Sequence, residues 1–375
     1  MHITVSITLP ALINTILCTN IMIIAYIIVI NSKFLLRYIN LSTVILGFLI
    51  ILLRFLFPYE FVFAKEIPDT MILPHIRNIL DSQIMNSKVT LLGCIIFVWL
   101  TISTVYFIKL VSDYFKTRNS LLKFDIIDDV EIKELLSCIN GKYKKESDIL
   151  LVTSPIISTP FIFGIHNPII ALPQISISKK ELSFIFEHEL CHYYKKHLQI
   201  KILLEVVTAI YFWNPFIYIL KKQIDKVLEL CIDAKVTEEL SEIEKIEYLE
   251  CLVRIAKIQQ TSMLIQNCTI AFSPTSSLKL TKRVKMLLDS PNHVNYPLFN
   301  KLFLSFTIVL IAVTYLFVYE PYSIRKDYSE NTFTINKDNA YYVLNKEHTY
   351  DLYVNSKYTS TVTVIFDSTL PVKEE

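Results

Sequence analysis

The stretch E-H-E-L-C-H-Y, residues 187–193, decides the fold of the central part of this chain. It contains the pattern H-E-x-x-H, in which His188 and His192 are four residues apart. On an α-helix, residues at this spacing share a face, so both imidazoles can bind one Zn²⁺ ion, and Glu189 can take a proton from the metal-bound water. Chance alone produces the pattern in about one such chain in a hundred. A third ligand is therefore needed to support a zinc site.

A second helical segment, residues 224–236, supplies a candidate for that ligand. It reads I-D-K-V-L-E-L-C-I-D-A-K-V, and its Glu229 and Asp233 lie four residues apart on one face. We predict that Glu229 binds the metal and that Asp233 holds a zinc-binding histidine in the correct tautomer. Each carboxylate alone is more typical of a solvated helix face. In combination with the upstream motif, the metal site is the favoured interpretation.

The apolar run at residues 201–220 lies between these two segments and is long enough to cross a membrane. If it crossed, His192 and Glu229 would end on opposite sides and could not share a metal. Asn214 can cap a new helix, and Pro215 suits a first helical turn. We therefore predict a helical hairpin that turns at this dipeptide and rests against the membrane spans or the bilayer interface.

The composition indicates a membrane protein. Apolar residues make up 53% of the 375 residues, charged residues only 19%, and the mean hydropathy is +0.44. These values exclude a disordered chain and an ordinary soluble domain, and the 4 glycines exclude a collagen-like repeat. The net charge of +2 gives no argument for direct binding to nucleic acid. Four stretches are long enough to span a bilayer, at residues 7–30, 39–57, 90–107 and 302–319.

Lysines and arginines in the short loops set the expected orientation. Lys33 and Arg37 follow the first stretch and a basic cluster follows the third, so both loops should be cytoplasmic. The seven cysteines form no tight pairing pattern, which agrees with a reducing compartment for the zinc motif. We expect three transmembrane helices in 1–112, a cytoplasmic zinc peptidase domain in 113–300, a fourth transmembrane helix in 301–319 and a short extracytoplasmic tail in 320–375.

Shorter patterns predict the local structure of the cytoplasmic segment. Residues 129–139 form an amphipathic pattern and predict a helix. Three β-rich runs at 149–153, 160–163 and 169–172, separated by proline and glycine, predict a small β-meander. The alternating sequence at 360–366 predicts strands in the tail.

Taken together, these residues resemble the BlaR/MecR-type membrane metallopeptidases over about residues 1–320. The resemblance is carried by H-E-L-C-H-Y, by W-N-P-F at 213–216, by E-L-C-I-D at 229–233, and by F-G-I-H-N-P-I-I-A-L-P at 163–173. It implies a mainly α membrane protein with an α+β, gluzincin-like zinc peptidase domain between the third and fourth spans.

The resemblance also implies roles for individual residues and partners. His188, His192 and Glu229 would bind zinc, and Glu189 would be the catalytic base. Family members connect extracytoplasmic events to cytoplasmic proteolysis. Their target is often a repressor of antibiotic-resistance genes, and the receptor also cleaves itself. Partners would then be the lipid bilayer and a cytoplasmic protein, with homodimerisation left open.

Three features depart from the family pattern or carry less information. Relatives often have Asp five residues after the second zinc histidine, where this chain has His197, which we interpret as a surface residue, with a role at the site as the alternative. We interpret Lys282, Arg283 and Lys285 as topology determinants or contacts for anionic lipid. The antibiotic receptors carry a penicillin-binding sensor after the last span, and the tail has no room for that fold, so we do not expect direct β-lactam sensing.

The stretch at 267–283 resembles the region where relatives are cut, around Ala271 and Phe272. A flexible loop is a suitable protease substrate, although an ordinary connector is equally compatible with the sequence. The favoured function is a zinc endopeptidase that cleaves a cytoplasmic regulatory protein, and itself, in transmembrane signalling. One alternative is a membrane quality-control or prenyl-processing zinc protease. Another is a zinc-stabilised receptor or scaffold without catalysis, which the intact Glu189 disfavours.

Overall fold

The structure is a computed structural model of the chain. It describes residues 5–6, 8–32, 39–61, 63–69, 72–84, 89–143, 147–262, 283, 296–321, 335, 339–345, 349–363, 365 and 370–374. The chain divides into two compact units. The first comprises Met1–Ile67 and Asn78–Glu320, and the second comprises Pro68–Arg77 and Pro321–Glu375. Each unit is described by itself.

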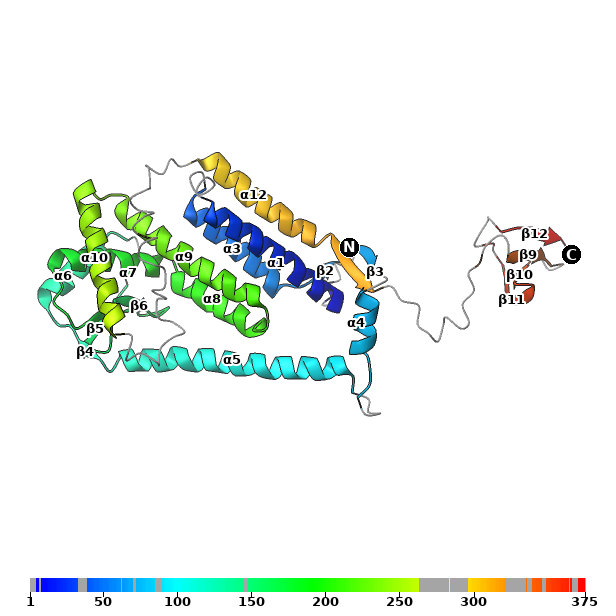
Figure 1. Ribbon diagram of the computed structural model, residues 1–375, viewed down its shortest axis with the longest axis horizontal. Helices are drawn as coiled ribbons and strands as arrows, with labels where there is room; N and C mark the ends of the chain where they lie inside the picture. The colour runs from blue at the N-terminus through cyan, green and yellow to red at the C-terminus, as the bar shows by residue number, and fades with distance from the viewer. Residues whose placement is uncertain are drawn as a thin grey trace. The chain divides into compact units, whose positions relative to one another are not determined.

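Long apolar helices dominate the first unit (Figure 1). Three of those described are long and apolar enough to cross a membrane, namely α1 (Leu9–Asn31), α5 (Leu91–Leu121) and α12 (Pro297–Thr314). The apolar helix α3 (Leu41–Leu56) has 16 residues and packs against α1 and α12. Four spans therefore stay a prediction. The fourth predicted span extended to residue 319, which is wrong at its end, because α12 stops at Thr314 and strand β8 (Phe317–Pro321) follows.

Buried polar side chains fix the end of α12 against α1 and α3. Arg54 of α3 is 2% exposed, and it donates a hydrogen bond from Nε to Thr314 Oγ1 at 3.0 Å. Its guanidinium also lies 3.9 Å from the centre of the Tyr315 ring. Asn14 of α1 donates to the carbonyl oxygens of Thr314 and Phe317. The bond from Asn14 to Thr314 satisfies a carbonyl group that the end of a helix leaves without a partner.

The predicted hairpin is confirmed. Helix α8 (His197–Ile210) and helix α9 (Pro215–Thr237) meet at Asn214, whose side chain accepts a hydrogen bond from the Phe216 N–H at 3.0 Å. The same side chain donates to Asn20 of α1 at 3.0 Å, and Tyr211 donates to the Phe55 carbonyl of α3 at 2.8 Å. The hairpin shares one apolar core with α1 and α3, and α5 packs on α8.

The first unit also contains a small mixed sheet, which follows α5 in the chain. Its order is β4 (Asp125–Ile126), β5 (Leu150–Ser154), β7 (Ile169–Pro173) and β6 (Phe161–Phe163). The meander prediction is wrong, because β5 and β7 pair directly in parallel and β6 takes the edge. All five residues of β7 are buried, which suits a central strand, whereas β6 is less buried.

Three helices cover this sheet region. Helix α6 (Val130–Asn140) begins at the N-cap Asp129, as the amphipathic pattern predicted. Helix α7 (Lys179–Tyr194) carries the zinc motif, and α10 (Glu242–Ser262) packs against it. The remaining short elements are β1 (Val5–Ser6), which pairs with β2 (Glu60–Phe61), β3 (Lys65–Asp69), which pairs with β8, and α4 (Ile72–Leu80).

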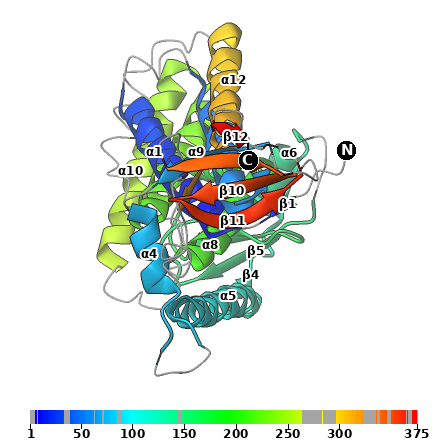
Figure 2. The ribbon, with the colours of Figure 1, turned by 90° about the vertical axis from the view of Figure 1, so that its right-hand side faces the viewer.

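The second unit contains a four-stranded sheet, shown in Figure 2. Its order is β11 (Lys357–Val362), β10 (Tyr350–Val354), β9 (Ala340–Leu344) and β12 (Val372–Glu374). A small core of Ala340, Tyr342, Val354 and Leu370 holds it together. Strands in the tail are thus confirmed, although β11 ends at Val362 rather than at residue 366.

Candidate metal centre

Helix α7 presents the first two candidate ligands. Ser178 and Glu181 form a capping box that fixes the start of the helix. Phe186 and Leu190 are completely buried in the core that α7 shares with the sheet and α10. This packing fixes the rotation of the helix about its axis. The motif histidines then point together toward α9.

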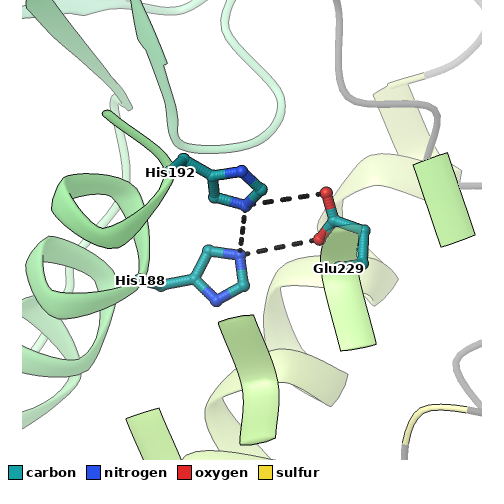
Figure 3. A group of neighbouring side chains, drawn as sticks. All are labelled: His188, His192 and Glu229. Carbon is teal, nitrogen blue, oxygen red and sulfur yellow. Dashed lines mark hydrogen bonds and ion pairs between the residues drawn. The ribbon is translucent and has the colours of Figure 1, made fainter. Parts of the chain in front are cut away.

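His188, His192 and Glu229 form a triangle of donor atoms (Figure 3). The two Nε2 atoms are 3.2 Å apart. His188 Nε2 lies 3.6 Å from Glu229 Oε2, and His192 Nε2 lies 3.6 Å from Glu229 Oε1. Zinc bonds of about 2.0–2.1 Å in a tetrahedron place ligand atoms about 3.3 Å apart. The triangle therefore fits one face of a tetrahedral zinc site, and two imidazoles with a carboxylate suit that metal.

The pKa shifts of Glu229 and His192 favour metal binding, whereas the raised pKa of His188 opposes it. Burial alone would raise the pKa of Glu229, but His192, His188 and Arg283 hold that pKa well below its ordinary value. Burial holds the pKa of His192 well below its ordinary value. Burial also lowers the pKa of His188, but Glu229 and nearby carboxylates outweigh it and leave the pKa raised. Glu229 is thus an anion and His192 a neutral imidazole, as metal ligands must be.

Glu189, the predicted base, is buried beside the triangle. Its Oε2 accepts a hydrogen bond from the Ile162 N–H of edge strand β6 at 2.9 Å. Burial raises the pKa of the Glu189 carboxyl to about 7. A carboxyl with this pKa can both accept and release a proton near neutral pH.

A chain of hydrogen bonds supports His188 from behind. Its Nδ1 lies 2.9 Å from the hydroxyl of Tyr248 on α10, and that hydroxyl donates to Asp233 Oδ1 at 2.8 Å. Asp233 itself is 3.7 Å from His188 Nδ1, so it reaches the histidine through Tyr248. Asp233, the predicted partner, therefore lies near the His188 ring, but the sequence does not predict Tyr248 as the residue between them.

Arg283 completes this arrangement from the chain that precedes α12. It donates from Nε to Asp233 Oδ2 at 2.7 Å and from a terminal nitrogen to Oδ1 at 2.5 Å. The prediction of a lipid contact is wrong for Arg283, because its side chain is only 16% exposed and pairs with the carboxylate of Asp233, which has no exposure; its role as a topology determinant stays a prediction. Neither Tyr248 nor Arg283 belongs to a local pattern, since they lie 15 and 50 residues beyond Asp233.

His197 is also placed differently from its predicted surface position. It is 3% exposed, and its Nδ1 lies 3.1 Å from Nδ1 of His192. Burial lowers the pKa of His197 to about 3, so this ring is neutral. The alternative interpretation, a role at the site, agrees with this placement. The predicted cleavage residues, Ala271 and Phe272, lie outside the described residues.

Sequence comparison agrees with this geometry. Residues 78–287, more than half of the chain, match the family described as BlaR1 peptidase M56. The chain belongs to this family. The regulatory protein BlaR1 of Bacillus licheniformis is 27% identical over 219 residues, which cover 58% of this chain and 36% of that relative. The methicillin resistance mecR1 protein of Staphylococcus aureus is 27% identical over 173 residues, which cover 44% of this chain and 29% of the relative.

The expected resemblance to BlaR/MecR-type peptidases is thus confirmed. The matched part spans about a third of the length of these relatives. Family membership and the apolar helices identify a membrane metallopeptidase of the BlaR/MecR type. The candidate centre at His188, His192 and Glu229 lies inside the matched region.

Proposed function

We propose that this chain is an integral membrane zinc endopeptidase that cleaves a cytoplasmic regulatory protein during transmembrane signalling. The observation that carries the proposal is the triangle of His188, His192 and Glu229, with the buried Glu189 beside it. The side chains come from α7 and from α9, the second arm of the hairpin, and a chance match to the motif would not explain why they meet.

Each residue has a distinct part in the proposed hydrolysis. His188, His192 and Glu229 would hold a zinc ion, which when bound polarises the scissile carbonyl and acidifies a water molecule. Glu189 takes the proton from the attacking water at a carboxylate oxygen and delivers it to the nitrogen of the leaving amine. The hydrogen bond from the Ile162 N–H holds Glu189 in place between these steps.

The membrane arrangement remains part of the proposal. The peptidase domain, 113–300, would lie in the cytoplasm between three helices in 1–112 and a fourth in 301–319, with the N-terminus and the tail 320–375 outside. The lysines and arginines of the short loops support this orientation. The names of the relatives support a regulatory role in antibiotic resistance. A transcriptional repressor is accordingly the proposed substrate, and cleavage of the chain itself near Ala271 and Phe272 is proposed as well.

Full-length protein purified in detergent tests this function directly. We expect one zinc ion per chain by metal analysis, and loss of that ion in His188→Ala. We also expect wild-type protein to generate new peptide termini in casein and in its own chain, as identified by mass spectrometry, and Glu189→Gln to generate none. Stoichiometric zinc with identical termini in wild type and Glu189→Gln would contradict a peptidase and favour a purely structural metal.

A further inference from the structure

The two histidines His192 and His197 face each other through the same ring atom. Their Nδ1 atoms are 3.1 Å apart, and their rings meet edge to face at 83°. The contact depends on a reversal of the chain at Lys196, which has a left-handed backbone with φ of 59°. A residue other than glycine adopts this conformation at a cost of about 1–2 kcal/mol. The chain therefore holds His197 against α7 even though the turn itself is unfavourable.

Metal binding decides which of the two rings donates the hydrogen bond. Nε2 of His192 faces His188 and Glu229, so a bound metal takes the lone pair of that nitrogen. In a neutral imidazole bound through Nε2, the proton sits on Nδ1. His192 must then donate from Nδ1, and His197 Nδ1 must accept. The proton of the His197 ring is accordingly on its Nε2 atom.

We propose that His197 is a positioning residue for the metal site. It accepts a hydrogen bond from the Nδ1–H group of His192 and thereby fixes the tautomer and the rotation of that ligand. The assignment rests on the proposed zinc site. His197 acts through His192, because its Nδ1 contacts the side of the ligand ring that points away from the triangle. It therefore does not bind the metal itself.

His188, the other ligand histidine, has a hydrogen-bond acceptor of a different kind. The hydroxyl of Tyr248 accepts from His188 Nδ1 and is itself bound to the Asp233 carboxylate. His188 is thus linked to an anion, whereas His192 is supported by a neutral ring. Partners of this sort orient ligand rings, and their loss typically weakens metal affinity by about 10–100-fold.

Two variants of nearly equal shape test the assignment. Asparagine can place its Oδ1 close to the position of the histidine Nδ1 and so keep an acceptor, whereas leucine has the same shape without one. We expect His197→Asn to keep the zinc affinity within about threefold, and His197→Leu to weaken it by about 10–100-fold. The exposed His166 gives the matched control, His166→Ala, which should not change the affinity.

The measurements are zinc affinity of the full-length protein by competition with a chelator, and the visible absorption of the Co²⁺-substituted protein. The absorption reports the geometry at the metal, which a residue that only fills space would not alter selectively. Equal affinities and equal spectra for the Asn and Leu variants would overturn the role of His197. If wild type binds no zinc that depends on His188, the proposed function fails as well, so the two failures are distinguishable.

Discussion

Helices α7 and α9 contribute to one metal centre, but different parts of the molecule hold them. Helix α7 is anchored by a capping box and by a core shared with the sheet and α10. Helix α9 belongs as far as Cys231 to the apolar core of α1 and α3, and its last turns join the core of α7 and are tied to Tyr248 and Arg283. The position of Glu229 relative to the histidines therefore depends on packing against the membrane helices as well as on the peptidase domain.

The two helices also differ in what their residues contribute to catalysis and to metal binding. Helix α7 carries two ligands and the predicted base, whereas α9 carries the third ligand and the carboxylate behind it. Substitutions on α7 can remove the proton acceptor and leave the ligands in place. Substitutions around α9 should change metal affinity and stability together.

The largest expected effect is that of Glu189→Gln on α7. An amide cannot accept the proton of the attacking water, so we expect a loss of about 10²–10⁴-fold in kcat/KM with the zinc content unchanged. Peptide hydrolysis and metal analysis on the same preparation check this. A proportional loss of zinc and activity would show that α7 does not separate the two roles.

The variant Arg283→Met tests whether the ion pair with Asp233 stabilises the end of α9. It leaves the fully buried Asp233 without its cation, and breaking such a pair costs about 3–5 kcal/mol. We expect a lower melting temperature and weaker zinc binding. The matched double variant Asp233→Asn with Arg283→Met should recover part of the stability, because no unpaired charge remains. If Arg283→Met melts like wild type, the buried ion pair does not support the centre.

The contrast between α7 and α9 also explains which parts of the site could be predicted from sequence. The ligands of α7 form one local pattern, and Asn214 with Pro215 marks the hairpin that returns Glu229. Arg283 and Tyr248 reach the site only through the tertiary fold, so no spacing rule finds them. The sequence predicts a surface position for His197, because its burial depends on the left-handed turn at Lys196, which a glycine at that position would indicate more clearly.

The strand order of the small sheet illustrates the same limit. Each of the three β-rich runs was found from composition and from the prolines between them. The order of the strands cannot be predicted in this way, because a short apolar run can form either a central strand or an edge strand. The backbone pairing in the folded protein places β7 between β5 and β6, and the burial of all of β7 agrees with that central position.

The buried carboxyl of Glu189 should give the metal-free protein a specific pH dependence. Burial raises its pKa from 4.5 to about 7, so the folded state holds this proton more tightly than the unfolded state. Stability then falls as pH rises between these two values and levels off above about 7, with a total loss of about 3 kcal/mol. Glu189→Gln lacks this loss.

Melting temperatures of metal-free wild type and Glu189→Gln, recorded at pH 5 and pH 8, check this dependence. Groups that titrate in both proteins cancel in the difference between them. We expect Glu189→Gln to gain stability relative to wild type at pH 8 and much less at pH 5. A difference that does not vary with pH would mean that Glu189 ionises normally in the folded protein.

The smallest expected effect concerns the link between the two helices. Tyr248 connects His188 of α7 to Asp233 of α9, and Tyr248→Phe removes only the hydroxyl that makes both hydrogen bonds. We expect zinc affinity to fall by about 10–100-fold while the melting temperature changes less than in Arg283→Met, because the ion pair at Asp233 persists. Chelator competition measures the affinity. Unchanged affinity would mean that α7 orients His188 without help from the Asp233 carboxylate of α9.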